Sequence, residues 1–261
     1  MTEHGLDELA RLEYPGRVIA LGLTESNVPF AASILTGRSD SSRNRIYHPD
    51  KRNRTVHVRP FDPTKIDPTQ AFWIYYPCMM TTEDGRVSVS NGLQTELIYS
   101  VFASDTRQRF AELALVHAVN SSQFRYDPLH GIVDITSNEI DKPNYTSRIS
   151  GAIAERGMAM IVAREGNVEK DIIHIGDAKK VLKIGEVRML PTYDGVDTGK
   201  NKLHQFTGDP LVGYVSGKTP EEIGQEFRRA TCPKNDNLVA LAVQFAVPKI
   251  QPYIFNAREK A

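Results

Sequence analysis

The sequence is poor in the residues that would place it in a class at once. It has two cysteines among 261 residues, and Cys78 and Cys232 lie too far apart to suggest a disulfide framework or a zinc site. No apolar run approaches the roughly 18 residues that a membrane span needs. The amino terminus also lacks the basic start and apolar core of a signal peptide. These absences predict a protein of a reducing compartment, the cytoplasm, with no membrane partner.

Net charge and several common functional motifs are absent as well. Lys and Arg together number 32, as do Asp and Glu, so the formal net charge is zero. Nucleic-acid-binding domains are usually basic overall, so this balance disfavours nucleic acid as a partner. The seven histidines show no metal-ligand spacing, and there is no Walker A loop, dinucleotide fingerprint or G-x-S-x-G elbow. We therefore expect neither a metal nor another cofactor.

Positive charge is nevertheless concentrated in residues 38–59, where seven basic side chains accompany two acidic ones. Six of the seven are Arg, whose planar guanidinium group suits an oxyanion such as phosphate. Residues 37–45 (GRSDSSRNR) add Ser hydroxyls and backbone N–H groups. This pattern predicts a phosphate site, and the alternative is a solvated surface loop. A further alternative is RNA binding by these arginines together with Tyr47 and Phe61.

The order of the predicted elements favours an α+β layered domain over alternating βαβ units. Residues 1–15 are expected to be an extension, followed by a single domain over residues 16–261. Residues 124–147 and 191–212 are predicted to be polar loops. Hydrophobic periodicity predicts strands at residues 17–22, 29–36, 55–59, 71–80, 86–90, 148–154, 158–163, 171–175, 181–190 and 238–247. Helices are predicted at residues 95–103, 106–119 and 220–229.

Three side chains in or beside these helices have expected roles. Asp105 is the expected N-cap of the second helix, and His117 on its apolar stripe is expected in the core. Thr219 is the expected N-cap of the third helix, whose first turn carries a proline.

Two polar segments adjoin predicted elements and are candidate sites. Residues 90–96 (SNGLQTE) place Asn91 and Gly92 at a helix start, where a tight turn can aim N–H groups at an oxyanion. A simple turn is the other interpretation. Residues 141–151 (DKPNYTSRISG) place polar side chains just before a strand, which indicates either a site or a decorated turn. Nearby acids offer a general base, and their spacing does not select among Asp127, Asp134, Glu139 and Asp141.

Residues 71–80 (AFWIYYPCMM) end in two residues of possible chemical interest. Tyr76 is either a core aromatic or a hydroxyl that reaches a pocket and contacts a heterocycle. Cys78 would be a nucleophile only with a histidine base beside it.

Taken in order, these segments resemble the archaeal-type IMP cyclohydrolase family. The resemblance implies a four-layer α-β-β-α sandwich of the N-terminal-nucleophile-hydrolase-like class. It also implies a homo-oligomeric enzyme that converts formamido-imidazole-carboxamide ribonucleotide (FAICAR) into IMP and water, the last step of de novo purine synthesis. The motifs that carry it are GRVIALG, PFAASILTGRS, residues 41–45, IYYPC, VSNGLQTE, residues 125–127, NYTSRISG, residues 191–194 and residues 206–210.

The sequence departs from the family pattern at a few positions. Residues 146–149 read TSRI where members read NTPRI-like, and Leu93–Gln94 stands where members place a histidine. The amino-terminal nucleophile of the wider fold is absent, since Thr2 follows Met1. These departures leave a second hypothesis, a diverged nucleotide-binding protein on the same scaffold.

Ring closure requires a base for the poor amide nucleophile and donors for the formyl oxygen. The arginine of the site is either Arg43 or Arg45. The residues expected to act in catalysis are Arg43, Tyr76, Glu139 and Asp141. The residues expected to bind the mononucleotide are Arg38, Arg45, Asn91, Gly92, Asp127, Asn144, Thr146 and Arg148.

Overall fold

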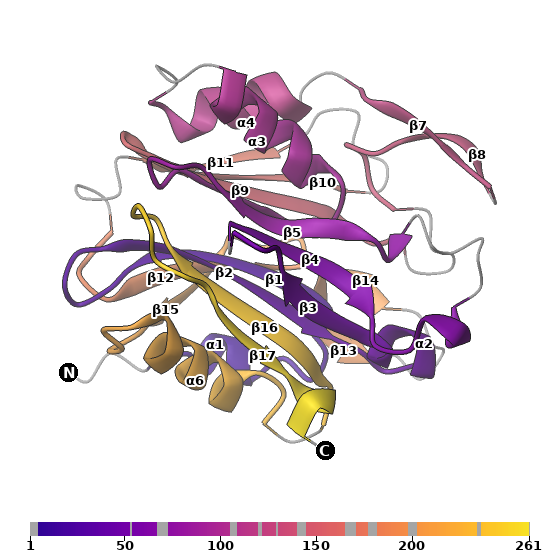
Figure 1. Cartoon of the computed structure of the whole chain (residues 1–261). Helices are drawn as coiled ribbons and strands as arrows, with labels where there is room; N and C mark the ends of the chain where they lie inside the picture. The colour runs from indigo at the N-terminus through magenta and orange to yellow at the C-terminus, as the bar shows by residue number, and fades with distance from the viewer. Residues whose placement is uncertain are drawn as a thin grey trace.

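The computed structural model describes most of the chain: residues 5–52, 54–66, 73–104, 109–119, 122–128, 130–139, 145–164, 171–176, 182–197, 203–233 and 236–260. Over these residues the fold is α+β, with mostly antiparallel sheets and few helices (Figure 1). None of the helices in these ranges is long and apolar enough to span a bilayer.

Two large antiparallel sheets form the centre of the described structure. The first has six strands in the spatial order β15 (Leu211–Tyr214), β12 (Glu186–Pro191), β1 (Arg17–Leu23), β2 (Pro29–Thr36), β16 (Leu238–Phe245) and β17 (Tyr253–Asn256). The second has seven, in the order β11 (Asp171–Gly176), β10 (Gly157–Ala163), β9 (Arg148–Ala154), β6 (Val87–Ser90), β5 (Tyr76–Thr81), β4 (Thr55–Pro60) and β3 (Arg45–Pro49). Two separate hairpins are β7 (Phe124–Asp127) with β8 (Gly131–Asp134), and β13 (Tyr193–Asp197) with β14 (Leu203–Gln205).

The sheets face each other, and helices lie on their outer faces (Figure 1). Helices α3 (Gln94–Ser104) and α4 (Ala111–Val119) pack on the seven-stranded sheet, whereas α1 (Asp7–Ala10) and α6 (Pro220–Ala230) pack on the other. The other short helices in the described ranges are α2 (Asp40–Arg43), η1 (Pro63–Lys65) and η3 (Ala257–Lys260).

The central strands are apolar on both faces because both faces are covered. Along β1, Ile19 and Leu21 lie in the core between the sheets, while Val18 and Ala20 lie in the core beneath α1 and α6. Successive side chains of a strand point to opposite faces, so one strand supplies both cores. This explains why these strands appear in the sequence as nearly unbroken apolar runs.

Several predicted elements are confirmed and their pairing is now defined. β1 pairs with β2 across the loop at residues 24–28, and β5 pairs with β6 across the turn at residues 82–86. Thr219 caps α6 as expected. Its hydroxyl accepts a hydrogen bond from the backbone N–H of Glu222, whose carboxylate accepts one from the backbone N–H of Thr219. Asp105 lies outside the described residues.

Other predictions were wrong, mainly at element ends and in polar segments. β5 begins only at Tyr76, and β12 begins at Glu186. The predicted loops at residues 124–147 and 191–212 contain strands β7, β8, β13, β14 and the start of β15, while β3 and β17 were not predicted at all. His117 is exposed on α4 and is not a core residue. The missed strands are short, and cross-strand pairing defines them more than hydrophobic pattern does.

The N-cap of α6 provides a stability test. We expect Thr219→Ala to lower the free energy of unfolding by about 1 kcal/mol, because it leaves a backbone N–H of the first turn without its acceptor. Thr219→Ser keeps the hydroxyl and should remain close to the wild type. Urea denaturation of the three proteins measures the effect, and equal stability of the Ala and Ser variants would contradict it.

Candidate functional site

One end of the paired sheets brings together strand ends from distant parts of the sequence. β1 begins at Arg17, which lies opposite Leu35 near the end of β2. In the facing sheet, β6 ends at Ser90, opposite Ser150 of β9, which itself begins at Arg148. This end is on the right in Figure 1, beside α2 and the β13–β14 hairpin. The start of β1 in one sheet and the start of β9 in the other therefore lie at the same end of the paired sheets.

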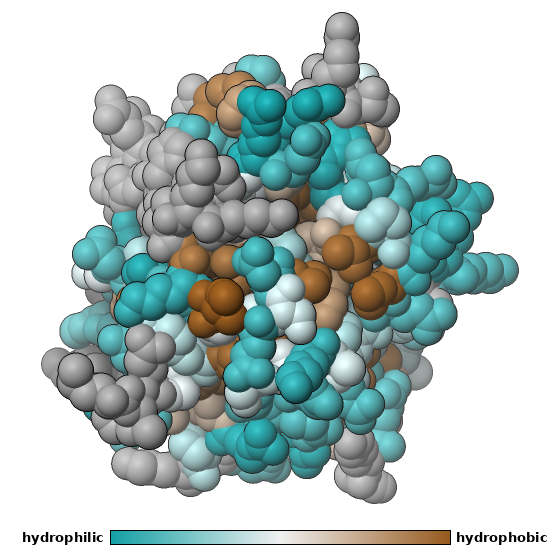
Figure 2. Space-filling view, turned by 90° about the vertical axis from the view of Figure 1, so that its left-hand side faces the viewer, coloured by the Kyte–Doolittle hydropathy of each residue, from teal (hydrophilic) through white to brown (hydrophobic). Residues whose placement is uncertain are grey.

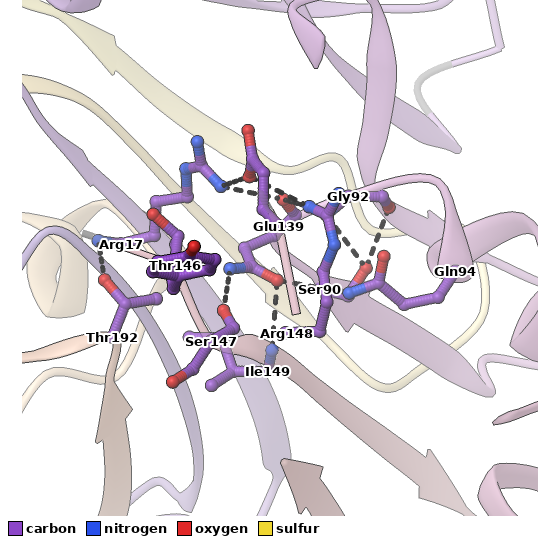
Figure 3. Close-up of polar contacts among 12 residues, drawn as sticks. Arg17, Ser90, Gly92, Gln94, Glu139, Thr146, Ser147, Arg148, Ile149 and Thr192 are labelled. Atoms are coloured by element: carbon purple, nitrogen blue, oxygen red, sulfur yellow. Dashed lines mark hydrogen bonds and ion pairs between the residues drawn. The ribbon is translucent and has the colours of Figure 1, made fainter. Parts of the chain in front are cut away.

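A buried carboxylate joins the two sheets at this edge (Figure 3). Nη1 of Arg17 donates to Oε2 of Glu139 at 2.7 Å, and Nη1 of Arg148 donates to the same oxygen at 3.1 Å. Glu139 is 6% exposed, and the Arg17 and Arg148 side chains are 14% and 5% exposed. Both guanidinium groups also donate to the backbone oxygen of Asn91, at 3.4 and 3.3 Å.

The arginines determine the protonation state of Glu139. Burial alone would raise the pKa of this carboxyl group, but the charges of Arg17 and Arg148 outweigh burial and lower its pKa to about 2. Arg45 contributes in the same direction. A base with so low a pKa accepts a proton poorly at neutral pH. We therefore interpret Glu139 as a permanently ionised counter-ion that holds the arginines in place.

Arg45, at the start of β3, belongs to the same group of charges. Burial and the neighbouring Arg17 lower the pKa of its guanidinium group, while Tyr76 and Glu139 oppose this effect. Its Nε atom is enclosed and has no hydrogen-bond partner within the described part of the chain. We call Arg17, Arg45, Arg148 and Glu139 the arginine cluster. Its three positive charges against one negative charge, with an unsatisfied buried donor, indicate an anion site.

Tyr76, a predicted catalytic residue, lies at this cluster. The residue is 5% exposed, and burial raises the pKa of its hydroxyl, while Arg17 and Arg45 partly offset that rise. Its neighbour Tyr75 is 46% exposed. Cys78, two residues further on, is a buried thiol whose Sγ donates to the backbone oxygen of Val56 at 3.4 Å. Burial raises the pKa of Cys78 to about 12, so it is not an activated nucleophile.

Asn91 and Gly92 also lie at the cluster, but they act on the protein's own groups. Oδ1 of Asn91 accepts from the backbone N–H of Ile149 at 3.0 Å and from Nε2 of Gln94 at 3.1 Å, and its Nδ2 donates to Ser147 at 2.7 Å. A Cβ at Gly92 would lie 2.5 Å from Nη1 of Arg148. Asn91 therefore ties β6 to β9, and Gly92 leaves room for the Arg148 guanidinium group.

A second set of contacts extends from Thr146 towards Arg38. The hydroxyls of Thr146 and Tyr193 are 2.5 Å apart. The Tyr193 ring stacks on Tyr14 with centroids 6.1 Å apart, and the Arg38 guanidinium carbon lies 4.7 Å from the centre of the Tyr14 ring. Thr146 also accepts a backbone hydrogen bond from Glu139. Thr146 thus contacts the arginine cluster directly, and Arg38 is connected to Thr146 through Tyr14 and Tyr193.

The remaining predicted residues have different surroundings. Arg43 donates from Nη2 to Oδ1 of Asn237 at 3.0 Å, a contact to the chain just before β16. Asp127 is fully buried on β7 and is bonded to His130. Asp141 and Asn144 lie outside the described residues.

The sequence interpretation missed Arg17, Trp73, Tyr14 and Tyr193. Arg17 is the first residue of a predicted apolar strand in GRVIALG, and no role was predicted for it. A charged residue at the start of such a strand is a pattern that could have identified it as a site residue. Trp73, the single tryptophan, lies with the Arg148 guanidinium carbon 5.1 Å from its ring centre. Tyr14 and Tyr193 show no pattern in sequence that links them.

The opposite end of the sheets has a different charge balance. A cleft there is lined by apolar residues that include Val28, Ala154 and Val247, and by two ion pairs. These pairs are Arg86 with Asp84 and Arg109 with Glu155. Figure 2 shows this face, where hydrophobic residues gather near the middle among hydrophilic ones. Its charges balance, so the end that carries the arginine cluster is the better candidate for an anion.

The low pKa of Glu139 gives a test of stability against pH. The ionised form stabilises the folded protein, and this contribution is lost as the pH falls from about 4.5 to about 2. We expect Glu139→Gln to lose about 3 kcal/mol of stability at neutral pH, because two buried guanidinium groups lose their counter-ion. The variant should also lose stability less steeply in acid. Urea denaturation over this pH range measures both effects.

Glu155→Gln is the matched control, because Glu155 forms an exposed pair with Arg109. It should keep the wild-type pH dependence. A Glu139→Gln protein with the stability and acid profile of the control would show that the cluster is not coupled as described.

Comparison with known families agrees with this geometry. The family model described as IMP cyclohydrolase-like protein matches residues 14–247. This range includes every residue of the arginine cluster and every strand of the two large sheets except the edge strand β17. No curated protein matches the chain. The chain belongs to the IMP cyclohydrolase-like family.

Proposed function

We propose that this protein closes the purine ring of FAICAR to give IMP and water. The observation that carries the proposal is the arginine cluster, with its excess of two positive charges and the enclosed Nε of Arg45. A phosphate monoester carries a charge of about −1.5 to −2 at neutral pH, which matches this excess. Membership of the family supports a purine nucleotide as the substrate.

In this proposal Arg45, and not Arg43, is the arginine of the site. Arg45 shares the electrostatic surroundings of Arg17 and Glu139, whereas Arg43 is engaged with Asn237. Both reacting groups of FAICAR sit on one molecule, so the enzyme has to hold a reactive conformer and stabilise charge on the formyl oxygen. Tyr76 and Arg148 are the donors proposed for this task. Asp141 and Asn144 remain predictions from the sequence.

The proposal also includes the fold class, the assembly and the location expected from the sequence. Two facing sheets with helices on both outer faces support a four-layer sandwich of the N-terminal-nucleophile-hydrolase-like class. The homo-oligomeric state and the cytoplasmic location belong to the same proposal.

A second candidate is a nucleotide-binding protein on this scaffold that has lost turnover. Gln94 favours it, because this residue replaces the histidine that the resemblance leads one to expect. Gln94 is 1% exposed and its Nε2 donates to Asn91. An amide in this position does not exchange protons at neutral pH.

The first prediction of the proposal concerns the reaction itself. Purified protein mixed with FAICAR should form IMP with saturable kinetics, measured by absorbance or chromatography. Tight binding of FAICAR or IMP without conversion would overturn the enzyme proposal and support the nucleotide-binding candidate.

The second prediction concerns the choice between the two arginines. Arg45→Ala should lower kcat/KM by at least about tenfold, or about 1.4 kcal/mol, because it removes one charge and the enclosed donor. Arg43→Ala should have a smaller effect. Arg52→Ala, at an exposed position in the turn between β3 and β4, is the control with wild-type kinetics. A larger loss in Arg43→Ala than in Arg45→Ala would reverse the assignment.

A further inference from the structure

A histidine–aspartate pair lies in the turn between β7 and β8. Oδ1 of Asp127 accepts the backbone N–H of His130 at 2.8 Å and lies 3.0 Å from Nδ1 of the same residue. Asp127 is fully buried, whereas the His130 side chain is 32% exposed. The pair therefore combines a fixed buried carboxylate with an imidazole that can reach solvent or a ligand.

This hydrogen bond fixes the orientation and the tautomer of the imidazole. A carboxylate that accepts from Nδ1 keeps a proton on that atom. In the neutral ring the lone pair is then on Nε2, the nitrogen that accepts a proton from a reacting group. A buried carboxylate that holds a histidine in this way is the usual arrangement of an oriented histidine base.

Trp73 connects this pair to the arginine cluster. The rings of Trp73 and His130 meet edge to face, with centroids 6.3 Å apart and an interplanar angle of 73°. Arg148 lies over the Trp73 ring and is bonded to Glu139. The charged group that contacts His130 directly is Asp127 on its own hairpin, and Arg148 with its partner Glu139 contacts the same Trp73 ring.

The arginine cluster itself does not offer a good base. Glu139 is held ionised with a pKa of about 2, and the arginines have no lone pair to give. Ring closure requires a group that takes up and returns a proton near neutral pH, which is the ordinary behaviour of histidine.

We propose that His130 is the proton-transferring residue of this site, that Asp127 is its positioning residue, and that Trp73 is the wall against which the purine ring closes. This inference rests on the proposed function. Arg148 lies over the Trp73 ring and His130 meets it edge to face, and a planar heterocycle can pack against an indole in a stacked or an edge-to-face geometry.

The proposed steps balance as follows. The carboxamide nitrogen bonds to the formyl carbon, and the C=O π pair moves to the oxygen. Nε2 of His130 takes the proton released by that nitrogen and returns it to the oxygen, giving a hydroxyl. The C–O bond then breaks as the formamide nitrogen loses its proton and the C=N bond forms. The oxygen leaves as water with one hydrogen from each nitrogen.

The kinetic test compares His130→Gln with His117→Gln, a control on the exposed face of α4. We expect His130→Gln to lower kcat by about 100-fold, the usual contribution of general acid–base catalysis, with KM changed only a few-fold. It should also change the shape of the pH–rate profile, because the group proposed to transfer the proton is removed. His117→Gln should retain both. Wild-type kcat and pH profile in His130→Gln would overturn the inference.

A second measurement does not depend on turnover. Trp73 is the single tryptophan, so tryptophan fluorescence reports on the surroundings of this one side chain. The His130 and Trp73 rings meet edge to face, so His130→Gln should change Trp73 emission, whereas His117→Gln should keep the wild-type emission. IMP should change Trp73 emission in all three proteins. A Trp73 emission that is the same in His130→Gln as in the wild type and does not change with IMP would also overturn the inference.

The two proposals fail in different ways. If the wild type does not convert FAICAR, both the proposed function and the catalytic role of His130 are wrong. If the wild type converts FAICAR and His130→Gln does so equally well, only the role of His130 is wrong.

Discussion

The Glu139 carboxylate between Arg17 and Arg148 is the interaction on which the rest of this site depends. Two guanidinium groups from different sheets share one of its oxygens, so the contact fixes the distance between the sheets at this end. Desolvating three charges is costly, and their mutual attraction and the hydrogen bonds to Asn91 help to offset that cost. A buried group of charges is weak evidence that these charges stabilise the fold. We interpret them as groups arranged to bind a ligand.

The same contact determines the chemistry that the site can perform. Glu139 neutralises one of three guanidinium charges, and the remaining excess, with the enclosed Nε of Arg45, favours an anionic ligand. Because two arginines keep the pKa of Glu139 low, this carboxylate is a poor general base. In our proposal anion binding and proton transfer are separate tasks: Arg148 of the arginine cluster lies over the Trp73 ring, and His130 meets the same ring edge to face.

Sequence patterns predicted the parts of the fold that follow from local periodicity. These parts include the apolar strands β1, β2, β6, β9 and β16 and the capped helix α6. They also include two hairpins, in which β1 pairs with β2 and β5 pairs with β6. Strands β7, β8, β13 and β14 were missed because each is short and lacks a clear apolar pattern, and pairing with the neighbouring strand defines them. Cys78 is another residue whose role could not be predicted from the sequence. Its thiol is unreactive because burial between the sheets raises its pKa.

The sequence by itself determined the α+β class, the concentration of arginine after β2 and the family resemblance. These depend on composition and on order along the chain, which the sequence contains directly. Only the tertiary structure decided that Arg45 and not Arg43 joins Arg17 and Arg148, and that His130 lies against Trp73. Arg17 and Glu139 are separated by 122 residues, and their contact exists because two antiparallel sheets end at the same edge. Charges so distant in sequence become one site only through that packing, which no local pattern records.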